Sequence, residues 1–322
     1  MTLQPGLPIL ARMPHDSLST LPPHPHMRAP RLPDATFDDH GHLYLAPPAL
    51  QGAVAAIVIR DTRGQTLNSA QRLTHYPASP FWCLAWYQGA TMGHVENTPD
   101  GPHWRPFAAQ VVVCGTQSQP TVSWAPGAAR AGMICFTADI AQALFGLDLS
   151  GINDRVVDAY QLLGTTWQPL LDGLLQAADD AATLALLEQH LAAPWQACQG
   201  RSSASASLRQ IGRYWVERLA RQAHEWQRGH STRQVERRIK AHSGRSLRQW
   251  QSLVRTEGVF FRARDRFEAG LPFDWVQIAL DEGFADQAHL SRSAKRITGF
   301  APSDFAQRFV EDESFWLYRL WV

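Results

Sequence analysis

One segment near the end of the chain carries a row of side chains suited to contacting nucleic acid. Gln287, Ser291 and Lys295 recur every four residues, and Arg292 lies on the neighbouring row. Residues four apart share one face of a helix, so these groups would form a single polar surface. Amide, hydroxyl, guanidinium and ammonium groups contact base edges and phosphates in protein–DNA complexes. For this helix taken alone, an ordinary solvated face stays an alternative.

The flanking sequence predicts how this helix is held. Val276, Ala279 and Leu280 fall at i, i+3 and i+4, which predicts the buried face of a preceding helix. Gly283 suits the position just past the end of that helix, and Asp286 suits the N-cap of the next one. Two short helices joined by a glycine-containing turn are typical of the helix-turn-helix motif. The buried stripe of the second helix is expected to be Leu290, Ala294 and Ile297.

A second copy of this pattern begins fifty-five residues earlier. A cap, an apolar residue, an arginine, a lysine and a glycine recur at matching offsets, as Ser231, Val235, Arg237, Lys240 and Gly244. Between the copies, residues 247–269 contain no proline and predict one long helix. At about 1.5 Å per residue it would be roughly 30 Å long, close to the ~34 Å turn of B-DNA. Its candidate buried residues are Leu247, Trp250, Leu253, Val254 and Phe261.

With these residues in place, the last hundred or so positions resemble the DNA-binding domain of the AraC/XylS family of bacterial transcription regulators. The resemblance rests on a spaced set of small, aromatic and basic residues in the second unit, namely Ile278, Ala279, Gly283, Phe284, Leu290, Arg292, Lys295, Gly299, Phe300 and Pro302. It implies an all-α domain with two helix-turn-helix units, double-stranded DNA as a partner, and a preceding β-rich effector-sensing domain of cupin-like form.

The sequence also departs from the family pattern. Ala294 stands where the family usually has phenylalanine, and the equivalent position in the first unit is Ile239. In the helix before the first recognition helix, His224 and Glu225 stand where small or apolar residues are expected. The first unit is therefore expected to differ from the second in packing or in DNA contact.

Thirteen residues are candidates for contacting DNA. The first unit would present to one major groove Thr232, Arg233, Glu236 and Arg237. The second unit would present Gln287, Ala288, Ser291 and Arg292, flanked by His289. Phosphate contacts are expected from Lys240, Arg245, Lys295 and Arg296. A carboxylate repels phosphate, so Glu236 is better suited to orienting Arg233 or Lys240 than to reading cytosine.

Length and composition agree with a soluble two-domain protein. The chain has 322 residues, of which 45% are hydrophobic and 18% charged. Basic residues outnumber acidic ones after residue 200 and the reverse holds before it, which suits a polyanionic partner for the C-terminal part. No apolar run approaches a membrane span of about 18 residues, and no signal peptide is evident. The expected location is the cytoplasm, on the nucleoid when DNA is bound.

The fold class expected is α+β, with five regions along the chain. Residues 1–35 are rich in proline and histidine and predict a flexible leader. Residues 36–198 predict a sensing and dimerisation domain, with strands at 53–59, 81–87, 109–114 and 133–137 and helices from 140 to 191. A glycine- and serine-rich linker at 199–207 leads to the DNA-binding domain at 208–310 and a tail at 311–322.

Several aromatic residues crowd the β-rich region. Trp82, Trp86, Tyr87, Trp104 and Trp124 are candidates for lining an effector pocket, with hydrophobic core as the alternative. A metal-dependent cupin enzyme would need a His-x-His and glutamate set, and His75, His94 and His103 stand alone. No catalytic residue, metal or cofactor is therefore expected, and the histidines at positions 15, 24, 26, 40 and 42 lack accompanying acidic or cysteine ligands.

The combined expectation is a ligand-responsive regulator without enzymatic activity. Its partners would be double-stranded DNA, a small-molecule effector, RNA polymerase and a second copy of the chain. Two alternatives remain. One is a redox- or alkylation-sensing regulator that uses the cysteines, which are Cys83, Cys114, Cys135 and Cys198. The other is a protein-interaction module whose C-terminal helices only resemble a DNA reader.

Overall fold

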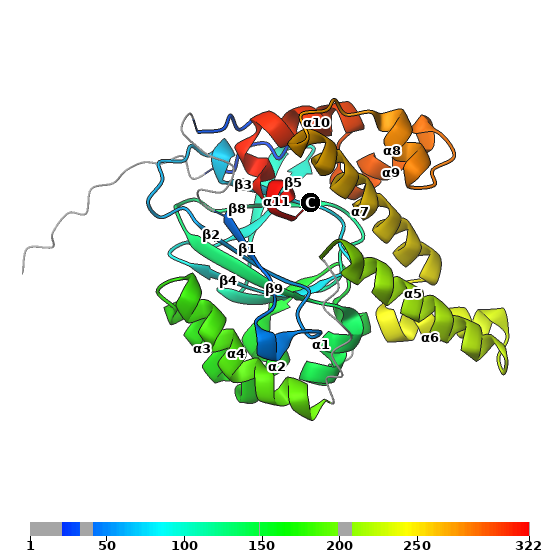
Figure 1. Cartoon of the computed structure of the whole chain (residues 1–322). Coiled ribbons are helices and arrows are strands. Elements are labelled where there is room, and N and C mark those ends of the chain that lie inside the picture. Colours follow the sequence, from blue (N-terminus) through cyan, green and yellow to red (C-terminus); the bar gives the residue numbers. More distant parts are fainter. Residues whose placement is uncertain (1–20, 33–40, 148, 199–207, 322) are drawn as a thin grey trace, which may run out of the picture.

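The computed structural model describes residues 21–32, 41–147, 149–198 and 208–321. The part of this range before residue 198 contains two β-sheets and a layer of helices, and the part after residue 208 is helical (Figure 1). The α+β class and the β-rich then all-α order expected from the sequence are confirmed. The expected linker at 199–207 lies outside the described residues.

The larger sheet has six antiparallel strands in the order β1-β2-β9-β4-β7-β10. Their bounds are Gly41–Tyr44, Ala56–Asp61, Arg130–Phe136, Trp82–Gln88, Val111–Cys114 and Val156–Asp158. The four predicted strands are confirmed as β2, β4, β7 and β9. Strands β1 and β10 were not predicted, because each is short and one alternation of three or four residues carries little periodic signal.

The smaller sheet has four antiparallel strands in the order β3-β8-β5-β6. They span Leu73–Tyr76, Thr121–Trp124, Gly93–Thr98 and Gly101–Pro106. Sequence reasoning missed all four, since polar and charged residues are scattered through them. Leu73, Val95 and Trp124 form the buried cluster on this sheet.

Helices cover one face of the six-stranded sheet. They are α1 (Ala138–Phe145), α2 (Ala159–Leu163), α3 (Gln168–Gln176) and α4 (Asp180–Ala197). The predicted leucine stripes, including Leu171 and Leu187, are buried with Leu84 of strand β4 in one core cluster. These leucines therefore pack the helices onto the six-stranded sheet and are part of the core. No strongly exposed large apolar side chain lies on α3 or α4 among the residues described.

The C-terminal part consists of seven α-helices in the described range. They are α5 (Leu208–Gln227), α6 (Thr232–Ser243), α7 (Leu247–Glu268), α8 (Trp275–Asp281), α9 (Gln287–Thr298), α10 (Pro302–Glu311) and α11 (Trp316–Trp321). The pairs α5–α6 and α8–α9 are the two helix-turn-helix units, and α7 is the predicted long helix between them. Trp250, Leu253, Val254 and Phe261 of α7 are buried as predicted.

The predicted buried face of α8 needs a correction. Val276 and Leu280 are 53% and 59% exposed, whereas Ile278 and Ala279 are buried. The helix is one position out of the register inferred from spacing, because a seven-residue helix offers two overlapping i, i+3 and i+4 patterns. Ile278 and Ala279 pack instead with Phe284 and Leu290 in a cluster of their own.

The rotation of helix α5 explains why His224 and Glu225 do not disturb the core of the first unit. His224 and Glu225 of α5 are both exposed, while Leu219 and Ala223 are buried. Ala223 is therefore the small residue that this helix places against the core. The two polar residues face away from it, and the first unit packs with a continuous apolar stripe.

The two ends of the described chain meet on the molecule rather than extending from it. Within residues 21–32, the Glu313 amide donates to the Ala29 carbonyl at 2.5 Å, and the Ala29 amide donates to Asp312 at 3.2 Å. The expected tail is no appendage, because helix α11 packs against strands β1 and β3. Its residues Leu317 and Tyr318 are buried. Of the leader expected at 1–35, residues 21–32 are described, and this segment is hydrogen-bonded to Asp312 and Glu313 of the expected tail.

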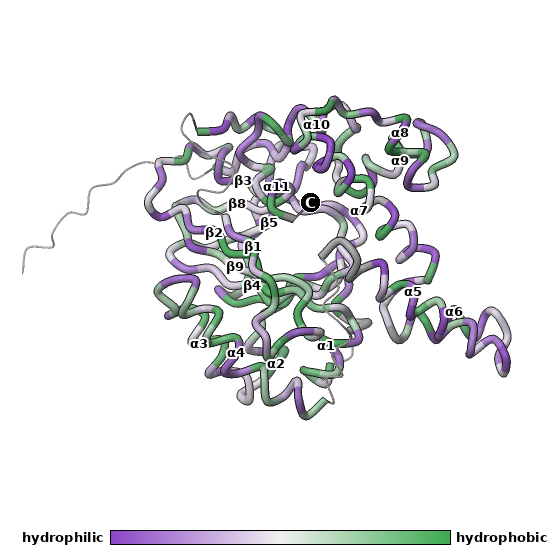
Figure 2. Tube along the Cα trace, in the orientation of Figure 1, coloured by the Kyte–Doolittle hydropathy of each residue, from purple (hydrophilic) through white to green (hydrophobic). Residues whose placement is uncertain are grey.

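Figure 2 shows hydrophobic stretches along the central strands and a largely hydrophilic helix α6 at the periphery. The apolar residues thus gather where the sheet and the helical layer meet. None of the described helices combines the length and the apolar character needed to cross a lipid bilayer.

Candidate nucleic-acid interface and ligand cavity

Helix α6 has a well-capped N-terminus and one face that is exposed to solvent. Ser231 caps it by accepting a hydrogen bond from the Gln234 amide at 3.4 Å, and the Gln234 side chain accepts from the Ser231 amide at 2.9 Å. Such a capping box satisfies backbone donors at the helix start. Val235 and Ile239 are buried and fix the rotation of the helix. The opposite face carries five of the predicted DNA contacts, all exposed, namely Thr232, Arg233, Glu236, Arg237 and Lys240.

Helix α9 repeats this arrangement. Asp286 is its N-cap, as predicted, and accepts a hydrogen bond from the His289 amide at 2.6 Å. Leu290, Ala294 and Ile297 are buried, as expected. The exposed face carries Gln287, Ala288, Arg292, Lys295 and Arg296, with Ser291 half-buried beside them.

Two predicted contacts in the second unit have partners inside the chain. The ring of His289 packs edge-on against Phe284, with ring centroids 5.2 Å apart. This contact favours the flanking role for His289 over base reading. Arg296 donates from Nη2 to the Ser252 hydroxyl of α7 at 2.5 Å, which holds the guanidinium over the long helix.

Arg245 does not lie where the sequence placed it. Its side chain is buried, and Nη2 donates to the Thr116 carbonyl and to Asp154 at 3.1 Å each. Burial lowers the pKa of the guanidinium, and the Asp154 carboxylate opposes that shift. The prediction of a phosphate contact at Arg245 is wrong, because this cation already neutralises an acid of the β-rich part.

Helix α7 connects the two helix-turn-helix units. With 22 residues, α7 is about 33 Å long at about 1.5 Å per residue. Helix α6 packs near its start, and helices α8 and α9 also pack against it. In Figure 1 helices α6 and α9 lie on the same side of the molecule, with α7 between them in the chain. The length of α7 itself is close to one turn of B-DNA, about 34 Å.

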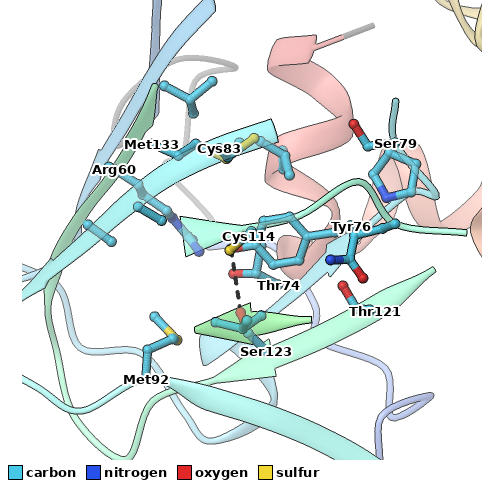
Figure 3. A pocket seen from close by; sticks show the side chains of 18 of the residues that line it. Arg60, Thr74, Tyr76, Ser79, Cys83, Met92, Cys114, Thr121, Ser123 and Met133 are labelled. Carbon is cyan, nitrogen blue, oxygen red and sulfur yellow. Dashed lines mark hydrogen bonds between the residues drawn. The ribbon is translucent and has the colours of Figure 1, made fainter. Parts of the chain in front are cut away.

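A cavity of about 150 Å³ lies between the two sheets. Its wall includes Cys83, Cys114 and Met133 from the six-stranded sheet and Thr74 and Ser123 from the smaller one (Figure 3). The helical part supplies further wall residues, namely Leu253, Ile297, Trp316, Leu317 and Tyr318. Sequence reasoning missed the cavity because its wall joins residues from distant parts of the chain.

The cavity is largely apolar but contains two buried arginines. Arg60 donates from Nη2 to Glu313 at 2.5 Å, and this ion pair is buried on both sides. Arg72 is also buried, and its Nη1 donates to the Leu67 carbonyl at 2.9 Å. No carboxylate pairs with Arg72 among the described residues, and burial alone lowers the pKa of its guanidinium. The Trp124 ring lies 5.9 Å from the Arg72 guanidinium, but that ring carries no counter-charge. A buried cation without a counter-charge is costly, so this end of the cavity favours an anionic group.

The aromatic pocket expected from the sequence has a different composition. Trp82 and Trp86 are fully buried on the opposite face of strand β4, in the core beneath the helices. Trp124 is fully buried as well, with the Trp104 ring edge-on to it at 5.5 Å. Of the five candidates only Tyr87 lines the cavity. Alternation along β4 explains this, since Cys83, Ala85 and Tyr87 face the cavity and the tryptophans face away.

The described residues form no group of histidine, cysteine, aspartate and glutamate suited to holding a metal ion. His75 is buried between the rings of Phe300 and Phe315, with centroids 5.2 and 5.0 Å away. Burial lowers its pKa to about 3, helped by the positive charge of Arg308. Such a histidine stays neutral at physiological pH and serves packing.

Comparison with known proteins returns weak structural similarity only. The solved structures that it finds include ToxT from Vibrio cholerae O395, at 10% identity and a TM-score of 0.35, covering 74% of this chain and 97% of that chain. A second ToxT structure from Vibrio cholerae has 9% identity and a TM-score of 0.36, covering 84% and 98%. A third, ToxT bound to an unsaturated fatty acid, has 12% identity and a TM-score of 0.35, covering 74% and 95%.

No family model matches the chain, and no curated protein matches it. Values this low do not assign a family or a function.

Proposed function

We propose that this protein is a sequence-specific DNA-binding transcription regulator, of the kind that the AraC/XylS resemblance implies. Helices α6 and α9 would enter two successive major-groove segments on one face of a duplex. The supporting observation is that each helix begins at a side-chain N-cap, exposes an arginine and a lysine at matching positions, and packs against the same long helix α7.

Within this proposal, base reading falls to the exposed residues near each helix start. Arg237 and Arg292 each suit bidentate contact with guanine, worth about 1 to 3 kcal/mol of discrimination. Gln287 suits adenine. Lys240 and Lys295, one turn further along, suit phosphate and would fix register without reading sequence. Glu236 lies 3.5 Å from Lys240 and orients that ammonium.

We further propose that a small molecule in the cavity sets the affinity for DNA. Ile297 of recognition helix α9 and Leu253 of α7 both line the cavity wall. The Ala78 amide also donates to the Ile297 carbonyl at 2.8 Å, so the loop before strand β4 holds α9 directly. The favoured ligand is apolar with one anionic group placed at Arg72. An occupant that shifts Leu253 or Ile297 would change how α9 lies against DNA.

The experiment that tests the DNA-binding proposal is a selection of bound sites from random double-stranded DNA at fixed salt. The proposal expects two conserved blocks about ten base pairs apart, one for each helix. A single block would remove one helix from the reader. The selection is run twice, without ligand and with decanoate, an apolar anion that serves as a trial ligand for the cavity. No enrichment under either condition would overturn the proposed function.

The ligand class is tested separately by calorimetric titration with decanoate and with decanol, which differ in the charged group. Binding of decanoate only, lost in Arg72→Met, is the expected result. Equal binding of both probes would contradict the anionic assignment, whatever the outcome with DNA.

A further inference from the structure

Three cysteines stand side by side across the six-stranded sheet. Cys83 of strand β4 is the direct register partner of Cys135 on β9 and of Cys114 on β7. Because neighbouring strands hold partner residues level with each other, all three side chains emerge on one face. That face is the cavity wall, where all three residues lie. Figure 3 shows Cys83 and Cys114 among the side chains that surround the space.

Within this row, one pair is in contact. The Sγ atoms of Cys83 and Cys135 are 3.0 Å apart and share a hydrogen bond. Directly opposed residues in an antiparallel pair have Cα atoms about 4.5 or 5.5 Å apart. Disulfides span Cα separations of about 4.4 to 6.8 Å, so this pair needs no strand movement to be bridged. No such contact joins Cys114 to Cys83 in the described structure.

We propose that Cys83 and Cys135 form a reversible disulfide when an organic hydroperoxide enters the cavity. This inference does not depend on DNA binding or on the ligand class proposed above. It names a modification site with two defined members and an oxidant whose apolar body suits the wall that holds them.

The chemistry proceeds in two balanced steps. The Cys83 sulfur attacks the outer oxygen of the hydroperoxide, so an S–O bond forms, the O–O bond breaks, and the alcohol leaves with the thiol proton. The product is a sulfenic acid on Cys83. The Cys135 sulfur then attacks that sulfur, so the S–S bond forms, the S–O bond breaks, and water leaves with the second thiol proton. The two thiols lose two electrons, and the hydroperoxide gains them.

Burial separates Cys83 from Cys135, and the contact with Cys135 separates Cys83 from Cys114. Cys135 is 1% exposed, while Cys83 and Cys114 are partly accessible. The hydrogen bond with Cys135 and burial raise the pKa of the Cys83 thiol, so it is protonated at neutral pH. A protonated, apolar-lined thiol reacts slowly with polar oxidants in bulk water. An apolar hydroperoxide held in the cavity gains proximity that hydrogen peroxide does not.

The test treats reduced full-length protein with cumene hydroperoxide or hydrogen peroxide, then alkylates remaining thiols in denaturant and maps peptides by mass spectrometry. The expected result is a peptide pair joined through Cys83 and Cys135, formed faster with cumene hydroperoxide and removed by dithiothreitol. Two of the four cysteines would no longer react with the alkylating agent. Exposed Cys198 would still be alkylated.

Variants identify the order of the steps. Cys135→Ser is expected to stop at the sulfenic acid, which dimedone traps on Cys83. Cys198→Ser is the matched control and should form the disulfide as the wild type does. A Cys83–Cys114 link, oxidation confined to Cys198, or four thiols that stay alkylatable would each overturn the proposal. The wild-type peptide map decides this even where a cavity variant fails to fold.

Discussion

Arg245 reaches from the turn after recognition helix α6 to Asp154 in the β-rich part, with Nη2 and Oδ1 3.1 Å apart. Its guanidinium also lies over the Trp250 ring, 5.5 Å from the centroid. A basic residue beside a recognition helix would ordinarily be assigned to phosphate. Here it joins the first helix-turn-helix unit to the other half of the molecule.

Replacing Arg245 with alanine should therefore reduce stability rather than electrostatic DNA binding. The change removes two hydrogen bonds and leaves the Thr116 carbonyl without that donor, so the free energy of unfolding in urea should fall by about 1 to 3 kcal/mol. The slope of log K against log salt for DNA should stay unchanged. A slope shallower by about 1 would return Arg245 to the phosphate contacts.

Lys295→Ala should show the opposite behaviour. Lys295 is exposed on α9, one turn beyond Arg292. Loss of one phosphate contact should weaken binding to specific and random duplexes equally and make the salt slope shallower by about 1. Lys295→Arg keeps the charge and serves as the control with an unchanged slope. If Lys295→Ala leaves the slope as in the wild type, this residue does not contact phosphate.

The buried Arg60–Glu313 pair fastens the C-terminal segment to strand β2. Glu313→Gln keeps the shape but leaves the Arg60 guanidinium without a counter-charge, so unfolding in urea should become easier by about 3 to 5 kcal/mol. Glu313 also lies 3.9 Å from the buried guanidinium of Arg319. The double variant Arg60→Met with Glu313→Leu therefore removes only one of the two cations that Glu313 balances, and it should recover part of this loss. A cost below about 1 kcal/mol for Glu313→Gln would mean that water reaches this pair.

His75 should make the fold sensitive to acid. Its folded-state pKa is about 3 against an ordinary 6.5, so between these values the unfolded chain binds a proton that the native chain excludes. Stability should fall by about 1.4 kcal/mol per pH unit as the pH drops from 6.5 towards 3. In the His75→Leu variant the free energy of unfolding in urea should depend on pH less steeply than in the wild type across this range.

His94, with its pKa lowered by burial to about 4, supplies a similar slope of its own and should remain in the His75→Leu variant. The comparison therefore uses the difference between the two proteins. Parallel pH profiles for wild type and variant would show that His75 titrates normally in the folded state.

The helical half was largely predictable because its signals are local. Asp286 and the buried residues of α9 lie within a dozen positions, and caps and periodicity are properties of neighbouring residues. Register within the short helix α8 was not predictable, since Val276 and Ile278 fit apolar stripes equally well. There the tertiary contact with Phe284 decides.

The cavity was not predictable for a different reason. Its wall combines Arg72, Cys135, Ile297 and Tyr318, which lie far apart in the sequence and come together only through the sheet order and helix α11. The same holds for Arg245, whose partner Asp154 is 91 residues away. The composition shows that tryptophans are abundant, but it does not show where each one lies. The alternation of side chains along strand β4 places Trp82 in the core and Cys83 at the cavity.

We propose that helices α6 and α9 read bases at the same time. The most direct measurement is the affinity of wild type, Arg237→Ala and Arg292→Ala for a selected two-block duplex and for random DNA at one salt concentration. Each variant should lose about 1 to 3 kcal/mol on the selected site beyond its loss on random DNA, and mutating the matching block should abolish the difference. Equal losses on both duplexes for either arginine would contradict the claim for that helix.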